Sequence, residues 1–234
     1  MSLTDDLFDL KPFKYRDLFQ NLDEPWRAIQ GLPDFLASWA EHRIEVEVHP
    51  RAVIEGPVSI GPGCRILGQA MICGPAIIGA GCVIGGLVRN SLLGDGCVVG
   101  HASEVANSIL LPGSVAAHFN YLGHACLGSG AHLGGGVLAA NVKLDQSPVS
   151  VRIGDRRVLT GMVKFSALIG DGAQFGAGCL LNPGTIVGRG CVVYPGSQLR
   201  GWYDPYSQIR VRLIEECRPC RSPQTSTENE RSEP

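Results

Sequence analysis

A six-residue repeat is the feature that most constrains how this 234-residue chain can fold. From residue 60 the sequence reads IGPGCR, ILGQAM, ICGPAI and IGAGCV, and each block opens with an aliphatic residue. The same phase returns after a break near residues 85–92, restarts at Leu127, and runs without a slip from Ile169 to Val193. This period is neither that of an α-helix nor the simple alternation of a single strand.

Such a period is typical of a parallel β-helix, in which short strands and turns coil around one stacked core. The opening aliphatic residue of each block faces the interior, and a small residue four places later also faces it. Gly occurs 31 times, about twice the usual share, which fits a chain with many regularly placed tight turns. The sequence therefore predicts an all-β fold, a single-stranded parallel β-helix over residues 46–200.

The repeat also explains most of the nine cysteines. Those in the small-residue position of the repeat are interpreted as small buried hydrophobes, not as a disulfide framework. They are Cys64, Cys82, Cys97, Cys126, Cys179 and Cys191. Cys217 and Cys220 form one CRPC motif, which indicates zinc only weakly because no second pair of ligands follows.

The two ends of the chain lack the period. Residues 1–45 carry Pro25 and Pro33 at positions where helices can begin, and they predict two short helices. We expect this segment to cap the open end of the β-helix or to form part of a subunit contact. Residues 201–220 are expected to close the solenoid, and the polar residues 221–234 are expected to be disordered.

The repeat also fails over residues 142–165, which predicts a loop that leaves the β-helix at one corner. This loop is locally basic, which leaves two interpretations open: a solvated loop, or a loop that recognises phosphate groups. Its basic residues are Lys143, Arg152, Arg156, Arg157 and Lys164.

The composition argues against several classes of protein. The net charge is −2 and no basic stripe is present, which argues against a nucleic-acid-binding protein. No apolar run is long enough for a membrane span, and the acidic N-terminus does not look like a secretory signal. We therefore expect a cytoplasmic protein.

The run VGHASEVANSILLPGSVAAHFNYLGHACLGSGAHLGGGVLAANVKLD, residues 99–145, resembles a known family. It is similar to the acetyltransferase half of the bifunctional N-acetylglucosamine-1-phosphate uridyltransferase/glucosamine-1-phosphate acetyltransferases, and to the β-helical half of related sugar-1-phosphate nucleotidylyltransferases. The similarity covers residues 45–200, without a counterpart of the nucleotidyltransferase half. It implies a left-handed β-helix that forms homotrimers, acetyl-CoA as co-substrate, no metal, and an amino sugar phosphate or nucleotide sugar as acceptor.

The resemblance also implies roles for individual residues. His118 matches the general base that takes a proton from the acceptor amino group, and Glu104 matches an acidic residue that orients this base. Tyr121 and Asn141 match residues that hold the substrate, and Arg89 lies close to a phosphate-binding arginine.

Further positions follow from the same resemblance. His132 takes the place of an asparagine in the substrate site, and Lys143, Gly161 and Ala177 are expected to contact acetyl-CoA. Backbone N–H groups of residues 134–136, or of Gly161, are expected to stabilise the oxyanion.

Departures from the family pattern keep other functions open. Ala106 replaces a phosphate-binding lysine, and His124 replaces an aspartate. An alternative is therefore a non-catalytic trimeric β-helix that scaffolds or regulates a nucleotidyltransferase. Another is a zinc hydrolyase like the β-helical carbonic anhydrases, which His101, His118, His124 and His132 would suggest. That pattern, however, has two histidines five apart, and His118 and His124 are six apart.

Overall fold

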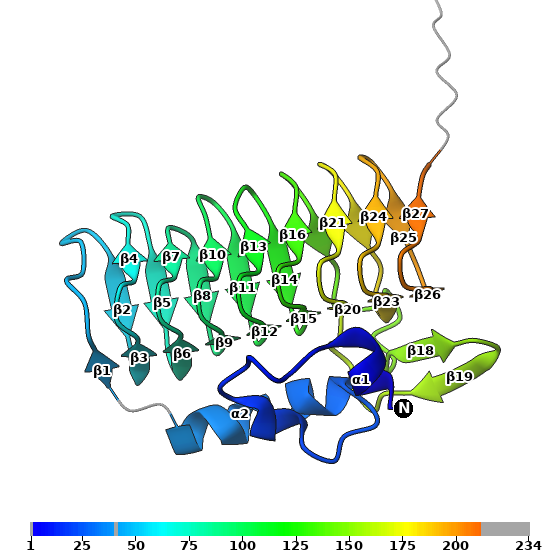
Figure 1. Ribbon diagram of the computed structural model, residues 1–234, viewed down its shortest axis with the longest axis horizontal. Coiled ribbons are helices and arrows are strands. Elements are labelled where there is room, and N and C mark those ends of the chain that lie inside the picture. The colour runs from blue at the N-terminus through cyan, green and yellow to red at the C-terminus, as the bar shows by residue number, and fades with distance from the viewer. Residues whose placement is uncertain (1, 40–41, 212–234) are drawn as a thin grey trace, which may run out of the picture.

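The computed structural model describes residues 2–39 and 42–211, which form a parallel β-solenoid with a helical segment along one side (Figure 1). Three parallel sheets, named A, B and C, run the length of the solenoid. Cys217, Cys220 and the predicted tail 221–234 lie outside the described residues.

The strands of each sheet come from successive coils. Sheet A contains β1 (Arg43–Ile44), β3 (Val58–Ile60), β6 (Ala76–Ile78), β9 (Leu92–Leu93), β12 (Ile109–Leu110), β15 (Cys126–Leu127), β20 (Ala167–Ile169), β23 (Thr185–Val187) and β26 (Trp202–Tyr203). Sheet B contains β4 (Arg65–Ile66), β7 (Val83–Ile84), β10 (Val98–Val99), β13 (Val115–Ala116), β16 (His132–Leu133), β21 (Gln174–Phe175), β24 (Val192–Val193) and β27 (Gln208–Ile209). Sheet C contains β2 (Val53–Glu55), β5 (Met71–Cys73), β8 (Leu87–Arg89), β11 (Glu104–Ala106), β14 (Tyr121–Gly123), β17 (Leu138–Ala139), β22 (Leu180–Leu181) and β25 (Gln198–Leu199).

The aliphatic positions of the repeat build the interior of the solenoid. Leu93, Leu110 and Leu127 hold the same position in successive coils, and all are fully buried. Burying a leucine contributes about 1.5–3 kcal/mol. Close stacking of the corners explains the glycines, since a Cβ on Gly100 would lie 2.0 Å from the carbonyl oxygen of Ala117. The predicted parallel β-helix is confirmed, and its left-handed sense stays a prediction.

The solenoid is longer than the predicted range 46–200. Strand β1 precedes this range, and β26 and β27 follow it. The first part of the predicted closing segment 201–220 therefore completes the last described coil instead of leaving the solenoid.

The cysteines are buried, but not all in the same place. Five of those predicted to fill the small-residue position pack in the interior core. Cys126 does not, because its neighbour Leu127 takes the inward position and Cys126 packs on the outer face of sheet A. The prediction of one shared interior position is thus wrong for Cys126. All cysteines of the described residues are free thiols, including the half-buried Cys73.

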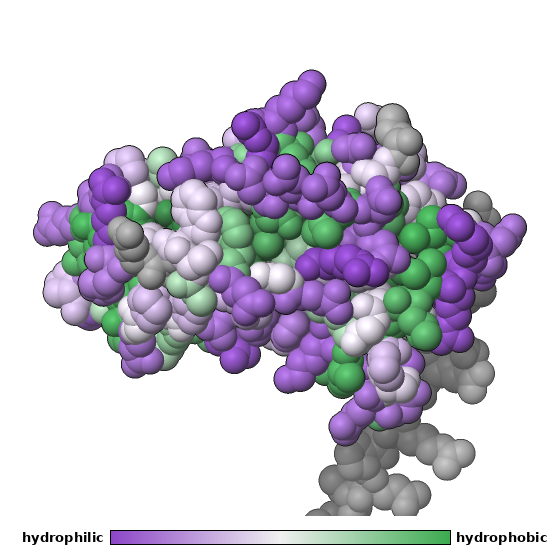
Figure 2. Space-filling view, turned by 90° about the horizontal axis from the view of Figure 1, so that it is seen from below, coloured by the Kyte–Doolittle hydropathy of each residue, from purple (hydrophilic) through white to green (hydrophobic). Residues whose placement is uncertain are grey.

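The N-terminal segment lies along the outer face of sheet A, and it does not cap the open end as expected (Figure 1). The reason is an apolar stripe on that face, which would be exposed without a cover. This stripe comprises Ile77, Leu92, Ile109, Cys126, Leu168 and Ile186. Trp26, Leu32 and Leu36 pack in the same apolar cluster. Seen from below, this side of the molecule is largely polar with separate apolar patches (Figure 2).

The segment contains α1 (Leu3–Leu7), a 3₁₀ helix η1 (Arg16–Phe19) and α2 (Trp26–Trp39). Pro33, expected at the start of a second helix, lies inside α2, where it removes one backbone N–H donor. Among the described residues, no helix is both long and apolar enough to cross a membrane.

Asp171 fixes the N-terminal segment to the solenoid. Its carboxylate accepts the backbone N–H of Asp9 at 2.6 Å and that of Ser129 at 2.8 Å. Arg189 lies 3.7 Å from this carboxylate and donates to the backbone oxygen of Asp5 at 2.9 Å. Burial raises the pKa of Asp171, while these donors and Arg189 oppose the rise. The segment is therefore held by polar contacts as well as by apolar packing.

The predicted loop 142–165 does leave the solenoid at one corner, between β17 and β20, but it is an ordered insertion. It contains an antiparallel hairpin of β18 (Ser150–Ile153) and β19 (Arg156–Leu159). A bridge between Val142 and Lys164 closes its base. Val149, Val151, Met162 and Phe165 join the apolar cluster under the N-terminal segment, which explains why the insertion is ordered.

Candidate active site

Strand β14 lies between two corners that carry most of the predicted site residues. His118 lies in the turn from sheet B to sheet C, here called the B–C corner. His124 lies in the turn from sheet C to sheet A, here called the C–A corner. The two histidines therefore occupy opposite ends of one strand, and within one chain they do not converge on a point.

His118 is exposed at the B–C corner, and its turn is held by the next polar residue. The backbone N–H of His118 donates to Oδ1 of the buried Asn120 at 3.0 Å. Asn120 in turn donates from Nδ2 to the carbonyl oxygen of Gly134 at 2.7 Å. The imidazole of His118 makes no hydrogen bond to any described residue, so it is available to a ligand.

Small residues follow His118 along this corner. The Gly136 N–H donates to the His118 carbonyl, and the Gly178 N–H donates to the Gly135 carbonyl, so Gly135 and Ala177 continue the corner in successive coils. A Cβ on Gly135 would lie 3.7 Å from the Cβ of His118. Within the described residues, the Gly135 N–H has no hydrogen-bond acceptor. The corner therefore offers a flat surface and one free backbone donor beside His118.

Glu104 and Arg89 form an ion pair on the outer face of sheet C. Glu104 lies opposite Tyr121 on β14, and Arg89 lies opposite Ala106 on β11. The Glu104 carboxylate accepts from Arg89 Nη2 at 2.9 Å and from Nε at 3.3 Å. The expected contact between Glu104 and the His118 imidazole is therefore not present in this chain. The reason is that diagonal neighbours of opposite charge on adjacent strands pair readily.

The side chains of Tyr121 and Asn141 both reach the space above Gly123. A Cβ on Gly123 would lie 2.6 Å from both the Tyr121 hydroxyl and Nδ2 of Asn141. Glycine therefore lets the phenol and the amide approach each other at the C–A corner.

His124 belongs to a ladder of polar residues at the C–A corner. Asn90, Asn107, His124 and Asn141 follow one another at a spacing of 17 residues. Asn90, Asn107 and His124 have left-handed φ values of 48°, 50° and 54°, which asparagine and histidine tolerate better than most residues. The same three side chains line a cavity of about 280 Å³ with apolar side chains of α2. This spacing of 17 residues is the signal in the sequence that places His124 in line with Asn141 of the candidate site.

The environment of His124 keeps its imidazole neutral. Asn141 Nδ2 donates to His124 Nδ1 at 3.2 Å, because an amide nitrogen has no acceptor capacity. The neutral ring therefore carries its proton on Nε2. Burial, with smaller contributions from the charges of Lys164 and Arg89, lowers the pKa of His124 to about 4.

Of the other predicted residues, the structure brings Ala177 to the corner of His118 and leaves His132, Gly161 and Lys143 elsewhere. His132 is exposed on sheet B, in register with Val115 and Gln174. Gly161 lies at the base of the insertion beside Gln30, Ala177 lies at the B–C corner, and Lys143 lines a separate basic cavity. The three positions expected to contact acetyl-CoA thus occupy three different places on one chain.

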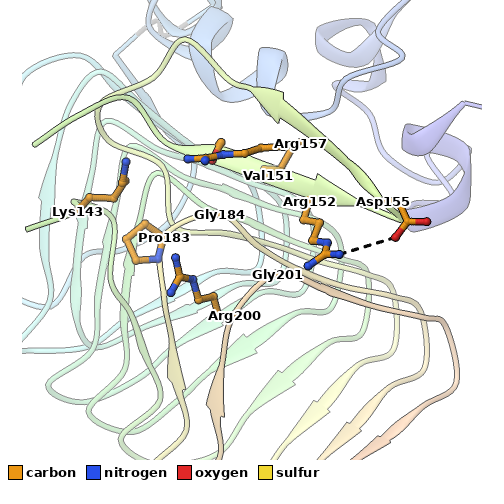
Figure 3. Close-up of a pocket in the computed structure, with 10 residues that line it drawn as sticks. Lys143, Val151, Arg152, Asp155, Arg157, Pro183, Gly184, Arg200 and Gly201 are labelled. Carbon is orange, nitrogen blue, oxygen red and sulfur yellow. Dashed lines mark hydrogen bonds and ion pairs between the residues drawn. The ribbon is translucent and has the colours of Figure 1, made fainter. Parts of the chain in front are cut away.

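This basic cavity has a volume of about 490 Å³ and lies between the insertion and the last coils (Figure 3). Three of the basic residues of the insertion line it, together with Arg200. Sequence reasoning missed Arg200, because only the stacking of coils brings the turn after β25 next to the insertion.

The histidines do not form a metal site in one chain. Within the part of the chain that the structure describes, no three His, Cys, Asp or Glu side chains are grouped to hold a metal ion. The zinc-hydrolyase interpretation therefore gains no support from the arrangement of His101, His118, His124 and His132.

Comparisons with known proteins agree with the repeat. Residues 166–201 match the family described as bacterial transferase hexapeptide (six repeats). The bifunctional protein GlmU of Methanococcus aeolicus is 31% identical over 179 residues, which are 75% of this chain and 43% of that protein. A bifunctional sugar-1-phosphate nucleotidylyltransferase/acetyltransferase of Sulfurisphaera tokodaii is 27% identical over 181 residues, 75% of this chain and 44% of that protein.

Among solved structures, the Arabidopsis UDP-N-acetylglucosamine acyltransferase matches with a TM-score of 0.43 and 15% identity, over 67% of this chain and 60% of that chain. A likeness at this level carries no argument about chemistry. The chain spans less than half the length of the two curated relatives. The hexapeptide coils and these matches show that the chain belongs to the hexapeptide-repeat transferase family, with distant similarity to GlmU and to the sugar-1-phosphate nucleotidylyltransferase/acetyltransferases.

Proposed function

We propose that this chain is an acetyl-CoA-dependent N-acetyltransferase that acts on an amino sugar phosphate or a nucleotide sugar. The observation that carries the proposal is the arrangement around β14. A free, exposed imidazole at His118 lies in the turn before the strand, and the Tyr121 hydroxyl and the Asn141 amide both lie over Gly123 at its far end. This arrangement supplies a base and a polar site for a sugar on one rigid scaffold.

In the proposed reaction, the acceptor amine attacks the carbonyl carbon of the thioester. His118 takes a proton from the amine as the C–N bond forms. The oxyanion of the tetrahedral intermediate accepts a hydrogen bond from the free Gly135 N–H, which lies beside His118. The C–S bond then breaks, and the imidazolium returns the proton to the leaving thiolate.

The two co-substrates approach from different directions in this proposal. Gly135 and Ala177 leave the B–C corner flat, so an extended pantetheine chain can lie close to the backbone there. Tyr121 and Asn141 hydrogen-bond hydroxyl groups of the sugar. We further propose a homotrimer, because His118 is open to solvent in a single chain and a neighbouring subunit would enclose it.

Calorimetric titration with acetyl-CoA, in the presence of EDTA, tests the proposal first. We expect micromolar binding near one site per chain, followed by release of free thiol when amino sugars or their nucleotides are added. Absence of binding at millimolar acetyl-CoA by folded protein would contradict the proposal. That result would favour the scaffold alternative. Ala106 supports this alternative, because the register places it between Arg89 and Gly123 on sheet C, and it has no charge there to bind a phosphate.

A further inference from the structure

The basic cavity collects cations from two separate parts of the chain (Figure 3). Lys143, Arg152 and Arg157 come from the insertion, and Arg200 comes from the turn after β25. Asp155 is the single carboxylate among the residues that line the cavity. The cavity therefore carries an excess of positive charge.

Two of these cations have no acidic partner within the described residues. Arg152 lies 3.7 Å from Asp155, and Lys143 lies 3.6 Å from Asp145. Arg157, by contrast, donates from Nε only to the Ser150 hydroxyl at 2.7 Å. The Arg200 guanidinium makes no hydrogen bond or ion pair to any described residue. Arg157 and Arg200 are therefore available to bind an anion.

The wall of the cavity is fixed by close backbone packing. Gly184 has a left-handed φ of 84°, and a Cβ there would lie 2.6 Å from the carbonyl oxygen of Ser150. The hairpin thus rests directly on the corner of the solenoid, and β18 lies beside β26. Arg157 and Arg200 consequently face the same cavity from elements that hold each other in place.

The cavity is connected to the candidate active site through the chain. Lys143 follows Asn141 by two residues, and the bridge from Val142 to Lys164 closes the insertion between them. Near the sugar site itself, Arg89 is already paired with Glu104. Two unpaired guanidinium groups, those of Arg157 and Arg200, therefore lie in the cavity, whereas the guanidinium on the Tyr121 sheet is already neutralised.

We infer that this cavity binds the pyrophosphate group of a nucleotide substrate, held between Arg157 and Arg200 with help from Lys143. Guanidinium groups bind phosphate oxygens through paired, charge-assisted hydrogen bonds. A cavity of about 490 Å³ also falls within the usual size range of small-molecule sites. The inference rests on the proposed function, in which either the acceptor or acetyl-CoA supplies the pyrophosphate.

Arg156 provides a matched control for the test. It precedes Arg157 on β19 but lines a different hollow, with Asp6, Glu24 and Trp202. Removing its charge changes the net charge of the same hairpin without changing the cavity. A comparison of Arg156→Gln with Arg157→Gln therefore separates a specific site from general electrostatic attraction.

The experiment titrates UDP, CoA and inorganic pyrophosphate separately into the full chain and into each variant by calorimetry. We expect at least one nucleotide to bind the wild type and inorganic pyrophosphate to compete with it. Arg157→Gln and Arg200→Gln should each weaken binding about tenfold, the effect of losing one charge-assisted contact. Arg156→Gln should change it less than about twofold, which corresponds to loss of long-range attraction only. Thermal unfolding of each variant verifies that it is folded.

The two nucleotides identify the source of the pyrophosphate. Arginine-dependent binding of UDP assigns the cavity to a nucleotide-sugar acceptor, and arginine-dependent binding of CoA assigns it to the acyl donor. Equal binding by wild type, Arg157→Gln and Arg200→Gln would overturn the inference, as would equal weakening by Arg156→Gln, or no binding of any of the three ligands. Acetyl transfer that depends on His118 would still stand in those cases. If the protein shows no acetyl transfer but still binds a nucleotide through Arg157 and Arg200, the proposed function would be wrong and the phosphate site would stand.

Discussion

The two ends of β14 show how one scaffold gives two histidines different environments. His118 at the B–C corner is exposed and its imidazole has no hydrogen-bond partner among the described residues, whereas His124 at the C–A corner is half-buried and bonded to Asn141. Helix α2 and the charged insertion lie against the C–A corner, whereas the corner positions in the two coils after His118 are the small residues Gly135 and Ala177. What packs on a corner, and not the residue type, therefore determines whether the imidazole of its histidine is open to solvent or enclosed and hydrogen-bonded.

The largest expected effect comes from removing the free imidazole. His118→Ala should lower the rate of acetyl transfer by about 10²–10⁴-fold, because it removes the proposed base. The measurement is thiol release under saturating acetyl-CoA. The control is His101→Ala, because His101 is exposed one coil away and contacts the neighbouring Phe119 ring. Equal rates for wild type and His118→Ala would rule out this role.

The second prediction compares the loss of stability when a glycine at each corner is replaced by alanine. Gly123→Ala places a methyl group 2.6 Å from the Tyr121 hydroxyl and the Asn141 amide, so these side chains must move. We expect a loss of about 1–3 kcal/mol in the free energy of unfolding, as for other overpacked sites. Gly135→Ala meets nothing closer than 3.7 Å and should cost less than this. Urea unfolding measures both, and similar losses would show that the corners do not differ in packing.

The pH dependence of stability tests the environment of His124. Its pKa falls from 6.5 to about 4 on folding, so the unfolded chain binds the proton first. Stability is then fully present above pH 6.5 and is lost as the pH falls toward 4, by about 1–2 kcal/mol after allowance for solvent screening. The variant His124→Asn keeps an asparagine at this corner, as at Asn90 and Asn107, and has no imidazole to titrate. Its unfolding free energy should therefore depend less on pH between 6.5 and 4. Parallel curves of unfolding free energy against pH for both proteins would contradict the assignment.

The smallest effect concerns the ion pair between the two corners. Breaking the pair of Glu104 and Arg89 with Glu104→Gln should cost only about 0.2–1 kcal/mol, because both side chains reach solvent. A double-mutant cycle with Arg89→Gln measures this coupling by urea unfolding. If Glu104 orients His118 instead, Glu104→Gln would alter the pH–rate profile of acetyl transfer. The structure predicts an unchanged profile.

Much of the fold was predictable from residue spacing, because every coil repeats the same inward position. The N-terminal segment was misplaced because the hexapeptide period marks inward residues and does not mark which lateral face is covered. A signal does exist in the sequence. Strands of sheet A carry adjacent aliphatic residues, such as Ile77 with Ile78 and Leu92 with Leu93, so both of their faces are apolar.

The site was less predictable than the fold. The roles that the resemblance implies for His118, Tyr121 and Asn141 stay predictions. The expected contact between Glu104 and His118 could not be judged from the sequence, because the sequence does not show that Arg89 lies within reach of Glu104. Arg200 was missed for a related reason. Arg200 lies beside Lys143 only because of the number of coils between them, and this number cannot be counted from the sequence, since the insertion interrupts the six-residue repeat.

The insertion has a consequence for how such a protein can change over time. Hydrogen-bonded partners in successive coils are 17 residues apart at Asn120 and Ser103, but 42 apart at Ser129 and Asp171. The extra residues depart and return at one corner, and the coils on both sides keep their register. The length and sequence of this segment can therefore change during evolution without a shift in the register of the coils, as long as its buried apolar side chains are kept.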